Sequence, residues 1–184
     1  MGAGKTTAGA LLADRLGWRF VDSDRVVEAR AGMSVGEIFD RRGETFFREL
    51  EAAAVREAVL SGPVVLALGG GALEAAATRD FLAGLPDCVI VFLDGPLDLL
   101  RARCEQHNEG PVRPILADRT RLEERWQSRL PWYRQAHLTV DTSERLPQAV
   151  VERILLDLEE RACILAESAD SLPAGASGKA GARA

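Results

Sequence analysis

The sequence is poor in cysteine and histidine, and it has no apolar run long enough to cross a bilayer. Its three cysteines, Cys88, Cys104 and Cys163, are far apart, and this spacing suits neither a zinc site nor a disulfide framework. The longest apolar runs, residues 64–68 and 88–93, have the length of single strands. No charged and then apolar leader opens the chain. These absences predict a cytoplasmic protein without membrane segments.

The sequence also lacks an excess of basic residues. Its 23 Lys and Arg against 28 Asp and Glu give a formal charge of −5, which argues against a nucleic-acid-binding surface. With 47% hydrophobic residues, the 184-residue chain has an ordinary globular composition. Residues 166–184 are rich in Ala, Gly and Ser and hold hardly any large apolar side chain. We therefore expect one domain over residues 1–165 and a disordered tail over residues 166–184.

Hydrophobic periodicity and turn signals divide the domain into alternating helices and strands. Continuous β-rich runs predict strands near residues 18–21, 64–68, 88–93 and 138–141. Helical spacing, caps and glycine stops predict helices near residues 8–16, 25–30, 34–42, 44–60, 74–83, 97–104, 119–135 and 148–163. Ser34 and Glu37 have the spacing of a capping box, and Gly17 and Gly43 are expected to end the helices before them. This alternation is typical of a three-layer α/β fold with a parallel sheet, in which ligands lie at the carboxyl ends of the strands.

The chain begins with half of a phosphate-binding loop. Gly4-Lys5-Thr6 matches the end of G-x-x-x-x-G-K-[ST], in which backbone N–H groups surround phosphates, the lysine reaches the β- and γ-phosphates and the hydroxyl ligates Mg²⁺. Residues 8–16 continue as a helix, whose N-terminus attracts anions. The first glycine of the motif would lie before Met1, and a bare GKT also occurs by chance. By itself, the GKT motif does not decide between a phosphate-binding loop and a chance match.

Polar residues and glycines follow two of the expected strands. Asp22 and Asp24 come at the end of the first strand, where they either form an acidic pocket beside the loop or cap the next helix. Gly69-Gly70-Gly71 follows the strand at residues 64–68. Three glycines in a row are entropically costly and suit a backbone that approaches a ligand closely, whereas a flexible turn needs only one. Because these features and the GKT loop fall at one edge of a parallel sheet, their convergence favours a ligand site.

Two arginines outside these loops are candidates for binding anions. Arg48 follows a pair of phenylalanines, and on a helix it could simply pair with Glu51 at i, i+3. Arg113 lies in a polar segment rich in chain breakers, about residues 105–118, which we expect to form a mobile lid. Arg113 is either a surface charge or, in a phosphate-transferring protein, a group that stabilises charge on the moving phosphoryl group.

Taken in order, these segments resemble the shikimate kinase family, which are P-loop kinases of the nucleoside-monophosphate-kinase type. The resemblance extends to about Leu158. It rests on D-S-D at residues 22–24, F-R-x-x-E at 47–51, an apolar strand with G-G-G-A at 64–72, R-P-I-L at 113–116 and R-L-P-W-Y at 129–133. A GKT loop is common among P-loop proteins, but the whole series in this order is specific.

The resemblance implies transfer of the ATP γ-phosphoryl group to the 3-hydroxyl of shikimate, with Mg²⁺ as cofactor, giving 3-phosphoshikimate and ADP. The implied catalytic residues are Lys5, Asp24 and Arg113. The implied shikimate-binding residues are Asp24, Arg48, Gly70, Gly71 and Arg129, and those for Mg²⁺ are Thr6 and Asp22. The implied ATP-binding residues are Gly2, Ala3, Gly4, Lys5, Thr6, Thr7, Arg103, Arg113 and Arg145. We expect a monomer whose partners are ATP and shikimate, with no nucleic acid and no membrane.

The sequence departs from the family pattern at two places. The segment between Arg103 and Arg113 is a few residues longer than usual. The first strand and the first loop glycine are missing, and because this strand is central in the family's sheet, its loss would expose the edges of both neighbours. We expect the native protein to begin upstream of Met1, which mass spectrometry of that protein would test. The alternatives are another small-molecule kinase, such as gluconate kinase, or a nucleotide-binding module inactivated by truncation.

Overall fold

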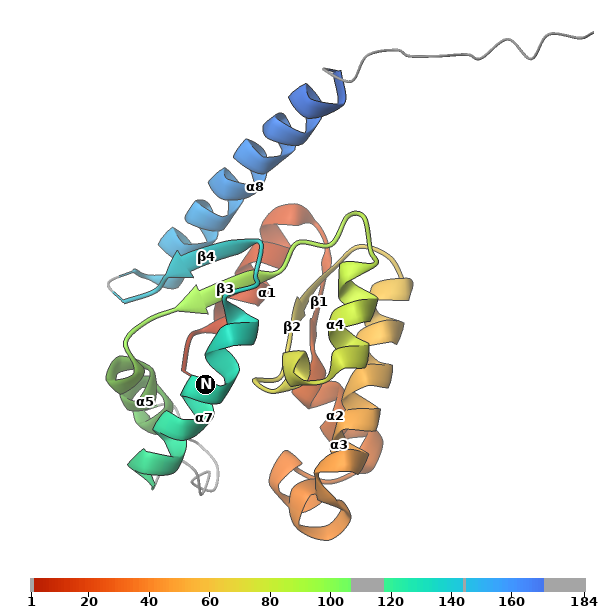
Figure 1. Cartoon of the computed structure of the whole chain (residues 1–184), viewed down its shortest axis with the longest axis vertical. Coiled ribbons are helices and arrows are strands. Elements are labelled where there is room, and N and C mark those ends of the chain that lie inside the picture. The colour runs from red at the N-terminus through yellow and green to blue at the C-terminus, as the bar shows by residue number, and fades with distance from the viewer. Residues whose placement is uncertain (1, 107–117, 144, 171–184) are drawn as a thin grey trace, which may run out of the picture.

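The computed structural model describes residues 2–106, 118–143 and 145–170, and of residues 164–170 the backbone only. Helices and strands alternate along the chain, as the sequence predicted (Figure 1). In chain order they are α1 (Lys5–Leu16), β1 (Arg19–Asp22), α2 (Ser23–Ala31), α3 (Val35–Leu60), β2 (Val64–Ala67), the short 3-10 helix η1 (Ala72–Glu74), α4 (Ala76–Ala83), β3 (Val91–Asp94), α5 (Leu97–Gln106), α7 (Arg119–Tyr133), β4 (Leu138–Asp141) and α8 (Pro147–Asp170).

The strands form two parallel pairs. Strand β1 pairs with β2, with Arg19 opposite Val64, and β3 pairs with β4, with Val91 opposite Leu138. Within the described residues no backbone pairing joins the two pairs, so β2 and β3 each keep one unpaired edge there. The α/β class with parallel strands is confirmed.

Helix α1 packs beside the first pair of strands. It packs against β1 and β2 on one side and against α8 on the other (Figure 1). Gly17 ends the helix in the left-handed conformation, at φ 66°, as its position after Leu16 predicted. The first core cluster lies around this helix and consists of Ala3, Ala8, Leu12, Leu93, Leu100, Val140, Val150, Val151 and Ile154. Apolar burial there fixes the N-terminal loop against the strand ends.

Helices α2 and α3 form the second core cluster, which consists of Val27, Ile38, Phe47 and Ala54. Ser34 and Glu37 make the predicted capping box at the start of α3, since Ser34 Oγ accepts from the Glu37 N–H and the Glu37 carboxylate accepts from the Ser34 N–H. Gly43 breaks the helical geometry at φ 82° and ψ 170°, so the two predicted helices join across a kink. The kink lies five residues before Arg48, in the part of the helix that reaches the site.

Several boundaries differ from the sequence prediction. Strand β3 begins at Val91 rather than at Cys88, and just before it the Ile90 N–H donates to the side chain of His137 rather than to a strand backbone. Helix α8 continues to Asp170, so residues 166–170, expected to be disordered, are helical. The remaining tail at 171–184 and the lid at 107–117 lie outside the described residues. Among the helices described, none is long and apolar enough to cross a membrane.

Candidate active site

The GKT loop forms the predicted junction with a helix N-terminus. Gly2 and Gly4 adopt positive φ angles of 69° and 81°, and Lys5 opens α1. No side chain caps this helix at Gly4, so its first N–H groups and its positive dipole end face outward from the loop. A side chain at Gly2 would collide with the Leu100 carbonyl, so α5 lies directly against the loop. This geometry suits an anion such as a phosphate.

Asp22 joins the loop to the end of β1. Its Oδ2 accepts a hydrogen bond from Thr6 Oγ1 at 2.9 Å. Its Oδ1 accepts from the N–H groups of Asp24 and Arg25 and so caps α2. The two interpretations of Asp22 therefore hold together, because one oxygen caps the helix and the other faces the loop. A hydroxyl and a carboxylate side by side are ligands that Mg²⁺ accepts when phosphates and waters complete its octahedron. Within the described residues, no cluster of three or more His, Cys, Asp or Glu side chains could hold a metal ion.

Asp24 lies on the other side of the same junction, beside the triple glycine. A Cβ added to Gly69 would lie 2.5 Å from Asp24 Oδ1 and would overlap Glu51 Oε1. The buried hydroxyl of Ser23 accepts a hydrogen bond from the Gly69 N–H at 2.8 Å, which fixes the end of β2 to the start of α2. The glycine run thus lets two carboxylates of the chain itself approach the backbone closely, and the predicted approach to a ligand stays a prediction.

Arg48 is held by carboxylates on several sides. Its Nη1 donates to Glu51 Oε2 at 2.7 Å, and its Nη2 lies 2.9 Å from Glu44 Oε1 and 3.5 Å from Glu74 Oε2. The i, i+3 pair with Glu51 exists, but Glu51 is buried and its second oxygen, Oε1, has no hydrogen-bond partner among the described residues. Burial raises the pKa of Glu51 above its ordinary 4.5, and the charge of Asp24 adds to the rise, against the opposing effect of Arg48.

Arg129 and Arg48 approach the same carboxylate oxygen from different helices. Arg129 lies on α7, and its Nη2 donates to Glu74 Oε2 at 3.1 Å, the same oxygen that Arg48 approaches. One turn further, Tyr133 donates its hydroxyl hydrogen to the Gly70 carbonyl and stacks on Phe92 of β3 with the ring centroids 5.2 Å apart. Burial raises the pKa of Tyr133, so its hydroxyl stays a donor at neutral pH. Arg129 and Tyr133 therefore hold α7 against the triple glycine.

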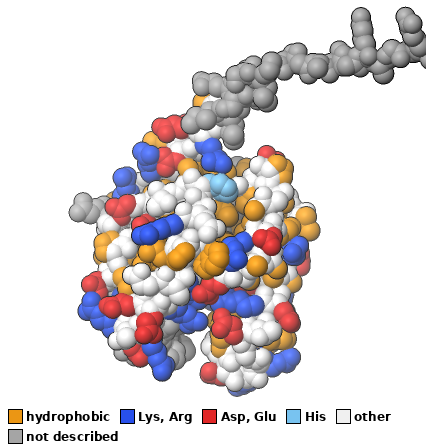
Figure 2. All heavy atoms as spheres, in the orientation of Figure 1, with side chains coloured by type: hydrophobic (Ala, Val, Ile, Leu, Met, Phe, Trp, Pro, Cys, Tyr) orange, Lys and Arg blue, Asp and Glu red, His pale blue; other side chains and the backbone are white. Residues whose placement is uncertain are grey.

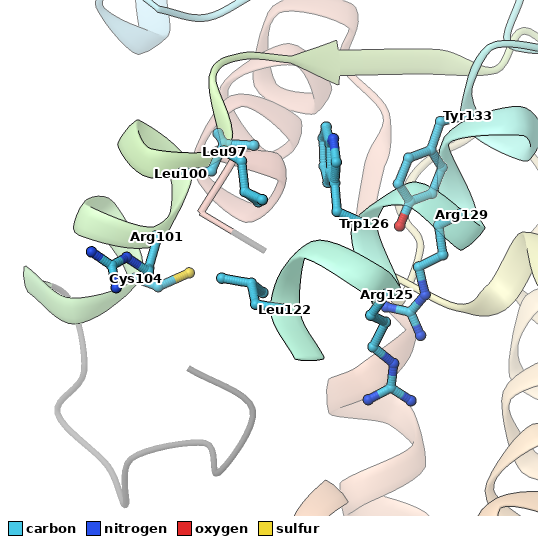
Figure 3. A pocket seen from close by; sticks show the side chains of 9 residues that line it. All are labelled: Leu97, Leu100, Arg101, Cys104, Leu122, Arg125, Trp126, Arg129 and Tyr133. Atoms are coloured by element: carbon cyan, nitrogen blue, oxygen red, sulfur yellow. The ribbon is translucent and has the colours of Figure 1, made fainter. Parts of the chain in front are cut away.

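A pocket adjoins this cluster between α5 and α7 (Figure 3). Its lining residues are Leu97, Leu100, Arg101, Cys104, Leu122, Arg125, Trp126, Arg129 and Tyr133. The Nε atom of Arg129 is buried without a hydrogen-bond partner among the described residues. Figure 2 shows the molecular surface hollowed between the α5 and α7 side and the α2 and α3 side, with acidic and basic side chains along both walls. The site is thus a charged cleft between the two halves of the chain.

Arg145 lies just after β4, and the side chain of Arg103 reaches the same turn from α5. Arg103 donates to the Thr142 hydroxyl at 3.1 Å and to the Thr142 and Ser143 carbonyls at 2.7 and 3.2 Å. Arg145 is exposed and lies near Asp141, whose pKa is lowered by hydrogen bonds from Ser143 and, to a smaller degree, by the charge of Arg145. The structure thus brings Arg103 to the turn that contains Arg145. Arg113 lies outside the described residues.

Most of the predicted residues therefore meet at the carboxyl ends of β1 and β2. Thr6 and Asp22 lie together, and Asp24, Arg48, Gly71 and Arg129 surround the turn after β2. Sequence reasoning missed Glu74, which looked like an ordinary acidic residue at the start of a helix. In the sequence, Glu74 is marked only by its place three residues after Gly71. Its ion-pair partners come from α3 and α7, which are distant in the sequence.

Comparisons with known proteins agree with this geometry. The model of the shikimate kinase family matches residues 1–159. A shikimate kinase of Psychrobacter arcticus is 40% identical over 159 residues, covering 86% of this chain and 84% of the relative. A shikimate kinase of Gloeobacter violaceus is 42% identical over 176 residues, covering 94% and 93%. A structure of the Acinetobacter baumannii shikimate kinase in complex with shikimate superposes with a TM-score of 0.77 at 32% identity, covering 88% and 89%.

The GKT loop on a helix N-terminus, the parallel strands and the acidic strand end define a P-loop kinase fold. A gluconokinase of Sinorhizobium meliloti shares this fold with a TM-score of 0.60 at 21% identity, and at that identity the likeness concerns the fold alone. The fold does not distinguish between these kinase families, whereas the family model and the relatives above are those of shikimate kinases. The chain belongs to the shikimate kinase family.

Proposed function

We propose that the protein transfers the γ-phosphoryl group of ATP to the 3-hydroxyl of shikimate. The oxygen–phosphorus bond forms at the shikimate oxygen, the bond from the γ-phosphorus to the bridging oxygen of ADP breaks, and the hydroxyl proton is lost. The observation that carries the proposal is the convergence of two guanidinium groups, those of Arg48 and Arg129, on one carboxylate oxygen beside Asp24 and the triple glycine. Two cations facing one anionic oxygen suit a substrate carboxylate.

In this proposal shikimate is bound by residues of α2, α3, α7 and the turn after β2. Arg48 and Arg129 bind the substrate carboxylate, since guanidinium groups match carboxylate geometry. Asp24, against Gly69, accepts hydrogen bonds from the hydroxyls and orients or deprotonates the attacking one. Gly70 and Gly71 allow the substrate to approach the backbone where a side chain would obstruct it.

The nucleotide side is built on the GKT loop and α1. Residues 2–7 surround the phosphates, and Lys5 neutralises charge on the transferring group together with Arg113. Thr6 would hold Mg²⁺ directly and Asp22 through water, and the ion would neutralise negative charge on the phosphates. Arg103 and Arg145 would lie along the nucleotide at the turn after β4. We further propose that the protein acts as a cytoplasmic monomer.

A coupled ADP-release assay tests the proposal. We expect ADP release to depend on shikimate, on ATP and on Mg²⁺, with neither gluconate nor buffer alone as an effective replacement for shikimate. Release stimulated by gluconate and not by shikimate would favour the gluconate kinase alternative. Nucleotide binding without release under any of these conditions would favour a module that binds and does not turn over.

A further inference from the structure

Glu74 places its carboxylate between the two arginines proposed to bind the substrate. Its Oε2 lies 3.1 Å from Arg129 Nη2 and 3.5 Å from Arg48 Nη2. The same oxygen would lie 2.7 Å from a Cβ added to Gly71, so it also lies against the glycine backbone. A carboxylate of this chain therefore occupies the place that an incoming carboxylate needs.

The backbone that carries Glu74 is fixed from outside the site. Arg79 of α4 donates to the Leu73 carbonyl at 2.6 Å and to the Glu74 carbonyl at 2.8 Å. The same guanidinium lies over the Trp132 ring, 3.7 Å from its centroid. The Glu74 side chain is free of such restraint, because a third of it is exposed, whereas Arg48 and Arg129 are 17% and 13% exposed. Only side-chain torsions need to change for the carboxylate to turn toward solvent.

Charge balance shows why the carboxylate must leave when substrate binds. Arg48 is already paired with Glu51 and Glu44, and Glu51 is buried and cannot move away. A substrate carboxylate added beside Glu74 would place another anion on the same guanidinium nitrogens, where like charges repel strongly because solvent screening is weak. Glu74 is the member of this group that contacts both arginines and has access to water.

We propose that Glu74 is an internal counter-ion that holds Arg48 and Arg129 in place in the free protein and is displaced by the substrate carboxylate. This inference rests on the proposed function. It makes Glu74 a competitor of the substrate, so it lowers the affinity for ligands that carry a carboxylate. When no ligand is present it pairs with the half-buried Arg129, which limits the cost of a desolvated charge, whereas Arg48 also keeps its pairs with Glu51 and Glu44.

The test is the dissociation constant of shikimate, measured by calorimetry without nucleotide, for the parent protein, Glu74→Gln and Glu74→Ala. We expect both variants to bind shikimate about two- to fivefold more tightly, the size of a partly exposed ion pair. The matched control is Glu44→Gln, which removes a carboxylate that pairs with Arg48 but has no ion pair with Arg129, and it is expected to change the constant by less than either Glu74 variant does. The methyl ester of shikimate lacks the competing charge, so its affinity is expected to be equal in Glu74→Gln and the parent.

The outcomes separate the inference from the function on which it rests. Unchanged shikimate affinity in both Glu74 variants would overturn it, and so would weaker binding, because Glu74 would then be a positioning residue and not a competitor. Tighter binding of ester and acid alike would also overturn it. If the parent and every variant fail to bind shikimate at all, the proposed function fails first and the inference with it. Circular dichroism of each variant establishes that the fold is retained.

Discussion

Replacement of Gly71 by alanine is a direct test of the proposed substrate site. Gly71 has φ −113° and ψ 3°, angles that alanine adopts without strain, so the effect comes from the added methyl group alone. That Cβ would lie 2.7 Å from Arg48 Cζ and 2.7 Å from Glu74 Oε2, and it would overlap Arg48 Nη2. The substitution therefore acts on the arginine clamp without a change in the backbone.

The distances give the expected size of the effect. Non-bonded heavy atoms prefer separations of about 3.5–4.0 Å, so the Arg48 guanidinium must retreat by roughly 1 Å. Arg48 cannot retreat freely, because Glu51 and Glu44 hold it from behind. A displacement of about 1 Å in a positioning group costs up to about a hundredfold, and we expect the KM for shikimate to rise about ten- to hundredfold.

Steady-state kinetics and thermal melting check this expectation together. For Gly71→Ala we expect the KM for ATP to change by less than about twofold, because the change is confined to the clamp. The control is Gly36→Ala, since a Cβ at Gly36 in α3 meets nothing within 4 Å. This control should leave both KM values unchanged and raise the free energy of unfolding by at most about 1 kcal/mol. If Gly71→Ala binds shikimate as well as the parent does, Arg48 is not a substrate contact.

Three further changes probe separate parts of the site. Arg129→Ala should raise the KM for shikimate about ten- to hundredfold by loss of charged hydrogen bonds, whereas Lys5→Ala should mainly lower kcat. If steady-state kinetics give the same pattern for both variants, the separate roles proposed for substrate binding and phosphoryl transfer are wrong. Thr6→Val should raise the Mg²⁺ concentration for half-maximal rate by about tenfold; an unchanged Mg²⁺ titration would remove Thr6 from the metal site. Burial raises the pKa of Glu51 in the folded protein above 4.5, so its stabilising effect is complete below 4.5 and is lost as pH rises through the folded pKa. Urea unfolding from about pH 4 to 8 should therefore show the parent losing stability relative to Glu51→Gln as pH rises, and parallel pH profiles would argue against a raised pKa.

Features that depend on neighbouring residues were predictable from the sequence. The capping box of Ser34 and Glu37 and the helix end at Gly17 appear where the sequence placed them, and the helix stop predicted at Gly43 appears as a kink. Each depends on the conformational preferences of a few consecutive residues, which the sequence states directly. The carboxyl-end position of Asp22, Asp24 and the triple glycine followed as well, because parallel strands bring their ends to one edge of a sheet.

Features that depend on distant partners were not predictable in the same way. Glu74 acquires its position from Arg48 on α3 and Arg129 on α7, which lie far from it in the sequence. Helix α8 continues through a stretch whose small residues suggested disorder, because alanine also favours helix and the preceding turns are buried against α1. In both cases contacts between residues distant in the sequence contribute to the outcome, and composition alone does not show them.

The junction between β1 and α2 explains how one short segment can serve both halves of the proposed reaction. Asp22 ends the strand in an extended conformation, and its carboxylate caps α2 through the Asp24 N–H while the other oxygen accepts from Thr6. Asp24 lies in the first helical turn, and its carboxylate lies beside Gly69. Because the cap fixes the turn, the two carboxylates face different neighbours, Thr6 and Gly69, and in the proposed reaction Asp22 serves the metal and Asp24 the substrate. Asp22→Asn would therefore test both roles at once: it should weaken Mg²⁺ dependence and also loosen α2, which a lower melting temperature would report. Unchanged stability would show that the cap contributes little to holding Asp24 in place.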